Sequence, residues 1–217
     1  MRYLCWLVGA VGAGLLQSGA NEPARTPVLQ NNTVAVTHLR FAPGVRETTH
    51  TNPFPVVLVQ ITPGEIEIKE QDTSRRGSRA GEVWYVPADR PHSITPRGNN
   101  GTIDLLAIGI LPTRQPAPAA PPTDAPPGIT RATLVDNSDV RVVRVRFDPS
   151  AREPVHTHPN DLLTVQITGG SMEMSIGPEH TLVYHDPGFV QFVPRNMQHS
   201  YASADTKPFE LLSISVK

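Results

Sequence analysis

The sequence has almost no cysteine. Its single cysteine, Cys5, lies in an apolar segment at the N-terminus, so the rest of the chain carries no thiol. A disulfide framework is therefore excluded outside that segment, and so is a thiolate nucleophile or metal ligand. Any metal site must be built from histidine, carboxylate or amide side chains.

An excess of charge of one sign is also missing. The formal net charge is −1, and lysine and arginine form no long run. Binding to nucleic acid or to an acidic membrane surface needs a concentrated positive patch. We therefore expect no nucleic-acid partner, and a small molecule is the more natural ligand.

The chain has no apolar run long enough for a stable membrane anchor. The apolar stretch Tyr3–Leu16 is shorter than the ~20 residues that a spanning helix needs. It follows Met1-Arg2 and precedes Ser18-Gly19-Ala20, an order typical of a secretory signal peptide. We predict cleavage after Ala20, no stable membrane insertion, and a secreted or periplasmic protein.

One sequence pattern occurs twice. The segment Arg40-Phe-Ala-Pro-Gly-Val-Arg-Glu-Thr-Thr-His50 returns as Arg146-Phe-Asp-Pro-Ser-Ala-Arg-Glu-Pro-Val-His156. Further along, the segment from Gly81 to His92 returns as the segment from Gly188 to His199. Such spacing indicates a tandem duplication of one domain.

The duplication and the proline-rich stretch between its copies divide the chain. We predict a signal peptide over 1–20, a flexible lead-in over 21–31, an N-terminal domain over 32–111, a linker over 112–130 and a C-terminal domain over 131–217. No segment keeps a helical period over three turns. Short strands are predicted instead in the first copy, with equivalents in the second, at 34–41, 56–61, 65–68, 83–86 and 103–110. The fold class is all-β, as two small sandwiches or barrels.

Three histidines in the second copy form a candidate metal site. On an extended strand, His156 and His158 would point to the same side with Cα atoms ~6.6 Å apart. Two imidazoles at that spacing can bind one ion, and His199 from a neighbouring strand would complete a three-histidine set. Satisfied structural histidines are the alternative.

These motifs resemble those of the cupin superfamily. His156-x-His158 is similar to the first cupin motif, and Gly188-x5-Pro194-x-Asn196-x2-His199 is similar to the second. Gly81-x5-Pro87-x-Asp89-x2-His92 repeats the second motif in the first copy. The resemblance implies two tandem antiparallel jelly-roll barrels, a bicupin, with a metal held by two histidines, a glutamate and a final histidine.

The chain departs from this pattern at the glutamate. Leu162 or Leu163 stands at that place in the second copy, and the first copy also has Asn52 instead of a histidine. We therefore expect one divalent transition metal in the C-terminal barrel, and a degenerate site of His50, Asn52 and His92 in the N-terminal barrel. The adjacent residues Arg46-Glu47 and Arg152-Glu153 recur in both copies and are interpreted as ion pairs at the barrel rim.

A metal bound by three histidines without a carboxylate resembles the site of Fe(II) cupin dioxygenases. The resemblance implies oxygen-dependent oxidation of a small chelating substrate, although Mn, Zn, Ni or Cu would fit the same ligands. Asp161 is a candidate ligand or base, and Gln166 is a candidate hydrogen-bonding group for substrate. The alternatives are a non-catalytic small-molecule or sugar-binding cupin, and an isomerase or decarboxylase. The sequence does not fix the oligomeric state, and a homo-oligomer is compatible with it.

Overall fold

The computed structural model describes residues 21–98, 101–112 and 125–217, which form sixteen β-strands and no helix. Among these described residues, no helix is long and apolar enough to cross a membrane. The first eight strands are β1 (Ala24–Gln30), β2 (Val34–Phe41), β3 (Val56–Gln60), β4 (Ile66–Glu70), β5 (Thr73–Gly77), β6 (Val83–Val86), β7 (His92–Pro96) and β8 (Ile103–Ile110). The other eight are β9 (Ile129–Asp136), β10 (Val140–Phe147), β11 (Asp161–Gln166), β12 (Gly170–Ile176), β13 (Glu179–His185), β14 (Val190–Val193), β15 (His199–Ser203) and β16 (Phe209–Val216).

The two halves have the same antiparallel topology. Each has a five-stranded sheet, in the order β1-β2-β8-β3-β6 or β9-β10-β16-β11-β14, and a three-stranded sheet, β5-β4-β7 or β13-β12-β15. Even the register repeats, since Phe41 pairs with Ile103 and Phe147 pairs with Phe209. The fold is all-β with two jelly-roll barrels, and the expectation of a duplicated domain is confirmed.

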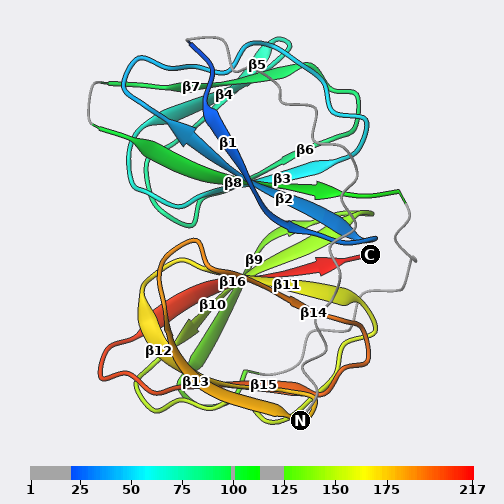
Figure 1. Cartoon of the computed structure of the whole chain (residues 1–217), viewed down its shortest axis with the longest axis vertical. Helices are drawn as coiled ribbons and strands as arrows, with labels where there is room; N and C mark the ends of the chain where they lie inside the picture. The colour runs from blue at the N-terminus through cyan, green and yellow to red at the C-terminus, as the bar shows by residue number, and fades with distance from the viewer. Residues whose placement is uncertain (1–20, 99–100, 113–124) are drawn as a thin grey trace.

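The two five-stranded sheets lie against each other in the middle of the molecule (Figure 1). One hydrophobic cluster contains buried residues from both, including Val57, Ile108, Leu163 and Ile214. Each of these sheets therefore has one face toward its own barrel and one toward the other barrel. For this reason β3 and β11 are buried at every position and lack the alternation of a half-exposed strand.

Polar contacts also join the two barrels. Thr33 Oγ1 donates a hydrogen bond of 2.7 Å to Asp161 Oδ2, and Arg144 Nη2 donates one of 2.7 Å to the carbonyl oxygen of Gly81. The Thr33 and Asp161 side chains are largely buried, so each supplies the partner that the other needs away from water. Together with the apolar cluster, these contacts fix the orientation of one barrel against the other.

Two predicted boundaries need correction. The lead-in over 21–31 is not flexible, because β1 (Ala24–Gln30) pairs along its length with β2. Its side chains are mostly exposed, and backbone hydrogen bonds hold it in the sheet, so the sequence carries no apolar pattern there. The C-terminal barrel begins at Ile129, which is buried in β9, rather than at 131. The signal peptide predicted over 1–20 and linker residues 113–124 lie outside the described residues.

Candidate metal centre

Backbone hydrogen bonds pair His156 with His199. The amide N–H of each donates to the carbonyl oxygen of the other at 3.0 Å, forming an isolated bridge at the start of β15. His158 follows in an irregular extended segment before β11, not on the strand that the sequence pattern predicts. The three rings nevertheless converge, with potential ligand atoms within 4.8 Å of one another.

A tight turn holds His158 in place. Asn196 has a positive φ of 59°, a backbone conformation that asparagine tolerates better than most residues, and its N–H donates to the carbonyl oxygen of His158 at 2.7 Å. In the N-terminal barrel, Asp89 has a φ of 57° and donates in the same way to Asn52. The turn before each final histidine therefore anchors the segment that carries the earlier ligand position.

Hydrogen bonds set which ring nitrogen each histidine presents. His156 Nδ1 lies 2.8 Å from the carbonyl oxygen of Pro154, and His199 Nδ1 lies 3.1 Å from that of Met197. A carbonyl oxygen only accepts, so each Nδ1 donates and each Nε2 keeps its lone pair for a ligand. This is the arrangement found around metal-bound histidines.

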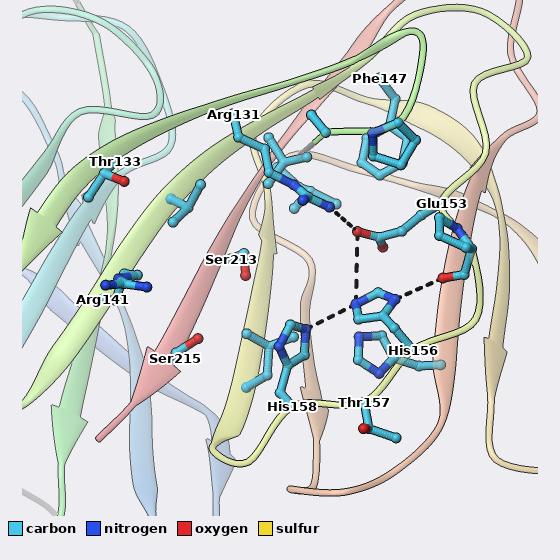
Figure 2. Close-up of a pocket in the computed structure, with 18 of the residues that line it drawn as sticks. Arg131, Thr133, Arg141, Phe147, Glu153, His156, Thr157, His158, Ser213 and Ser215 are labelled. Carbon is cyan, nitrogen blue, oxygen red and sulfur yellow. Dashed lines mark hydrogen bonds and ion pairs between the residues drawn. The ribbon is translucent and has the colours of Figure 1, made fainter. Parts of the chain in front are cut away.

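The ligand spacing also fits one ion. His156 Nε2 and His158 Nε2 are 3.0 Å apart, and Figure 2 marks this contact with a dashed line. Two nitrogens each about 2.0 to 2.1 Å from one metal, at roughly a right angle, are separated by about 3 Å. In the metal-free chain, a proton on His158 Nε2 bridges the same gap as a hydrogen bond.

Burial favours the neutral form of two of these imidazoles, those of His158 and His199. Burial lowers the pKa of His158 to about 4, and the nearby His156, His199 and Arg131 act in the same direction. Burial likewise lowers the pKa of His199. Neutral imidazole is the form that binds a metal, so the donor set fits a divalent transition ion at neutral pH.

The ion pair predicted for Glu153 is present, but the residue is buried beside the histidines and not at an exposed rim. Glu153 does not pair with Arg152, which instead contacts Glu173 at the surface at 2.6 Å. Glu153 is buried; its Oε1 accepts a hydrogen bond of 2.6 Å from Arg131 Nη2 and lies 3.9 Å from His156 Nε2 (Figure 2). Neighbouring residues of an extended segment point to opposite sides, and this alternation is the signal that separates Glu153 from Arg152.

The two candidate catalytic residues lie away from the histidines. Asp161 accepts hydrogen bonds from Thr33 in the other barrel and from the backbone N–H of Arg195 at 2.9 Å, so both its oxygens are engaged at the contact between barrels. Gln166 is buried, and its Nε2 donates to the carbonyl oxygen of Thr168 at 2.7 Å, closing a turn. The geometry supports a structural role for both residues.

A cavity of about 700 Å³ opens beside the histidines. Apolar side chains including Val143, Val145, Leu162 and Leu211 form part of its wall. Polar groups face it from three strands of the five-stranded sheet: Arg131 and Thr133 from β9, Arg141 from β10, and Ser213 and Ser215 from β16 (Figure 2). Both arginines are paired with acids, Arg131 with Glu153 and Arg141 with Asp136, so the cavity is polar without a large excess of charge.

The N-terminal barrel contains a related but different cluster. His50 and His92 form the same backbone bridge, and Asn52 stands at the place of His158 with its Nδ2 3.5 Å from His92 Nε2. Glu47, the counterpart of Glu153, lies 3.9 Å from His50 Nε2.

Comparison with known proteins finds solved structures with a similar fold. No family model and no curated protein sequence matches the chain. Among solved structures, AerE from Microcystis aeruginosa has a TM-score of 0.70 at 15% identity, covering 90% of this chain and 98% of its own. A cupin 2 conserved barrel domain protein from Leptotrichia buccalis has a TM-score of 0.64 at 20% identity, covering 94% and 93%.

A mutant of salicylate 1,2-dioxygenase from Pseudoaminobacter salicylatoxidans is also similar. Its TM-score is 0.67 at 12% identity, and the match covers 85% of this chain and 71% of the enzyme. At these identities the likeness shows the fold, which is that of the cupins. The present chain has this fold twice.

Proposed function

We propose that the C-terminal barrel binds one divalent transition metal through His156, His158 and His199, and that the protein is a non-haem, Fe(II) dioxygenase-like oxidoreductase acting on a small chelating substrate. The observation that carries this proposal is the convergence of three ligand nitrogens, within 4.8 Å of one another, at the wall of a cavity of about 700 Å³. Similarity to a dioxygenase of the same fold supports the reaction class.

The bound ion would act as a Lewis acid with open coordination positions for substrate and O₂. The chain's own residues have three tasks. The carbonyl oxygens of Pro154 and Met197 orient two of the ligand rings, the apolar wall around Leu162 and Leu211 excludes water, and the Ser213 and Ser215 hydroxyls can hold polar substrate groups.

Glu153 would lie close to the metal, paired with Arg131, without joining the three nitrogens as a ligand. Arg131 holds its Oε1 at 2.6 Å, and the same oxygen is 3.9 Å from His156 Nε2. Because the arginine neutralises the carboxylate, the ion would retain most of its positive charge for an anionic, bidentate substrate.

Oxygen uptake tests this function directly. The Fe(II)-loaded mature protein would be mixed with a panel of small bidentate acids, including salicylate, in an oxygen electrode cell. We expect uptake with at least one acid, and we expect His199→Ala to abolish it while the surface variant His180→Ala keeps it. If no acid supports uptake but some raise the melting temperature in the presence of chelator, the protein is a binding cupin and not an enzyme.

Glu153 supports a second candidate function, a metal-dependent decarboxylase or isomerase. Such chemistry needs a group that moves a proton near the metal, and Asp161 is turned away from the cavity whereas Glu153 lies 3.9 Å from His156 Nε2. An assay under argon distinguishes the two candidate functions. A lyase or isomerase would turn over substrate without O₂ and lose that activity in Glu153→Gln, whereas an oxygenase would show no turnover until O₂ is admitted.

We also propose that the protein is exported, through cleavage after Ala20. The support is the order of a positive residue, an apolar stretch and small residues in 1–20. N-terminal sequencing of the protein after expression with its full leader tests this. A first residue of Asn21 in the exported fraction is expected, and an intact Met1 in the cytoplasmic fraction would contradict it.

A further inference from the structure

We propose that the N-terminal barrel holds a second divalent metal ion, bound by Glu47, His50 and His92. The potential ligand atoms of these three side chains lie within 4.8 Å of one another. This set differs from the three histidines of the other barrel, because Asn52 replaces the middle histidine and Glu47 supplies a carboxylate from the opposite end of the segment. The site is independent of the proposed function.

The two imidazoles are oriented for metal binding. His50 Nδ1 lies 3.0 Å from the carbonyl oxygen of Thr48, and His92 Nδ1 lies 3.0 Å from that of Arg90. Each Nδ1 must donate, so each Nε2 presents a lone pair. The rings lie together with centroids 4.3 Å apart, the same spacing as His156 and His199.

The carboxylate has an unmet need that a cation would satisfy. Glu47 is 3% exposed, and its Oε1 pairs with Arg25. Its Oε2 is buried and has no hydrogen-bond partner among the described residues. A buried carboxylate oxygen without a partner is costly, and a metal ion that the Glu47 carboxylate binds through both oxygens would offset that cost.

Side-chain packing leaves less open space in the N-terminal barrel than in the C-terminal barrel at one equivalent position. Gly109, on β8, has the Phe54 ring so close that a Cβ at Gly109 would lie 2.4 Å from it. In the other barrel the equivalent positions are Ser215, which lines the cavity, and Asn160, which is bonded to the carbonyl oxygen of Val216. Phe54 therefore occupies the part of the N-terminal barrel that corresponds to the open cavity.

A structural role suits a metal ion in a barrel where Phe54 takes up part of the space. Two imidazoles and one carboxylate suit Zn(II), Mn(II) or Fe(II). Such an ion would tie the segment before β3 to the start of β7. We therefore infer two metal ions per chain with different tasks, one structural and one beside the cavity of the C-terminal barrel.

Metal stoichiometry tests this inference. The full mature chain would be stripped with chelator, reloaded with Zn(II) or, separately, Mn(II), desalted and measured by mass spectrometry of the metal. We expect about two ions per chain in the parent protein, about one in His92→Ala, about one in His199→Ala and none in the double variant. His180→Ala, an exposed histidine on β13, is the matched control and should keep both.

Glu47→Gln gives the same test with less risk to folding, because glutamine keeps the volume and can still accept a hydrogen bond from Arg25. It should bind about one ion, and its thermal melting should no longer respond to the second equivalent of metal. The inference is overturned if His199→Ala binds no metal, or if Glu47→Gln and His92→Ala bind as much as the parent. A parent that loses its only ion in His92→Ala but not in His199→Ala would instead contradict the proposed function and uphold this site.

Discussion

Arg131 Nη2 lies 2.6 Å from Glu153 Oε1, and this ion pair fixes a buried carboxylate beside His156. The pair is repeated in the other barrel, where Arg25 contacts Glu47 beside His50. In both cases the arginine comes from the first strand of its barrel, β1 or β9. The duplication has therefore kept an arginine, a glutamate and two histidines at the corresponding places of each half, and the C-terminal site adds a third histidine and a cavity.

Replacement of Arg131 by leucine should destabilise the metal-free protein. Glu153 would be left buried and unpaired, which costs up to about 3 to 5 kcal/mol for a fully buried pair, and less here because Arg131 is partly exposed. We expect about 2 kcal/mol in urea unfolding with chelator present, and a smaller loss with Zn(II) bound. Arg152→Leu is the matched control, since its exposed pair with Glu173 should contribute less than about 1 kcal/mol. Equal losses in the two variants would contradict the buried role of Glu153.

Asp161→Ala should weaken the contact between barrels without affecting metal binding. The change leaves the Thr33 hydroxyl and the Arg195 N–H without their acceptor, a cost of about 1 to 3 kcal/mol in unfolding free energy. Metal content should remain that of the parent protein. Thr33→Val, which removes the same hydrogen bond from the other side, should show part of the same loss. A lower metal content in Asp161→Ala would contradict this prediction and show that Asp161 contributes to metal binding.

Acid should destabilise the metal-free protein between about pH 6.5 and pH 4. Burial lowers the pKa of His158 from 6.5 to about 4, so over this range the unfolded chain binds a proton that the folded chain does not. Stability therefore falls as pH falls, by at most about 1.4 kcal/mol per pH unit for each such histidine. His199 and His92 have pKa values shifted in the same direction.

The variant His158→Asn isolates the contribution of His158, and asparagine is the residue found at the equivalent position 52. Urea unfolding at several pH values with chelator present should give a shallower dependence on pH than in the parent. An unchanged slope would show that His158 titrates in the folded protein as it does in the unfolded chain.

Gly109→Ala should destabilise the N-terminal barrel, because the new Cβ would lie 2.4 Å from the Phe54 ring. Overpacking of this kind costs about 1 to 3 kcal/mol. In a Phe54→Ala background the same change should cost little, and the difference between the two costs measures the contact. Ser215→Ala, at the equivalent place in the open cavity, is the control and should change stability by less than about 0.5 kcal/mol. A Gly109→Ala cost that does not depend on Phe54 would mean that the N-terminal barrel is not filled in this way.

Much of the fold could be predicted from sequence because the duplication repeats both the strands and the motifs. The strand at 34–41 and its equivalent at 140–147 are correctly placed, and the three histidines of the second copy lie together. β1 could not be recognised, since its side chains are mostly exposed and its place depends on backbone pairing with β2.

The environment of the site was harder to predict than its histidines. The sequence makes Asp161 a candidate base because it stands one place before the position of the family glutamate, yet it lies on the face of β11 that contacts the other barrel. That face exists only because two barrels pack together, which no pattern within one copy reveals. The sequence also gives no sign that Glu153 is buried, because its partner Arg131 lies on β9, a strand that begins within the predicted linker.

The position of a bound metal decides whether the three histidines of the C-terminal barrel form a metal site. A crystal of the mature protein loaded with Co(II) would be measured on both sides of the cobalt absorption edge, so that the ion alone changes the anomalous signal. We predict an anomalous peak about 2.0 to 2.2 Å from the Nε2 atoms of His156, His158 and His199. The absence of a peak among these three nitrogens after loading would contradict the proposed site and show that the histidines are structural.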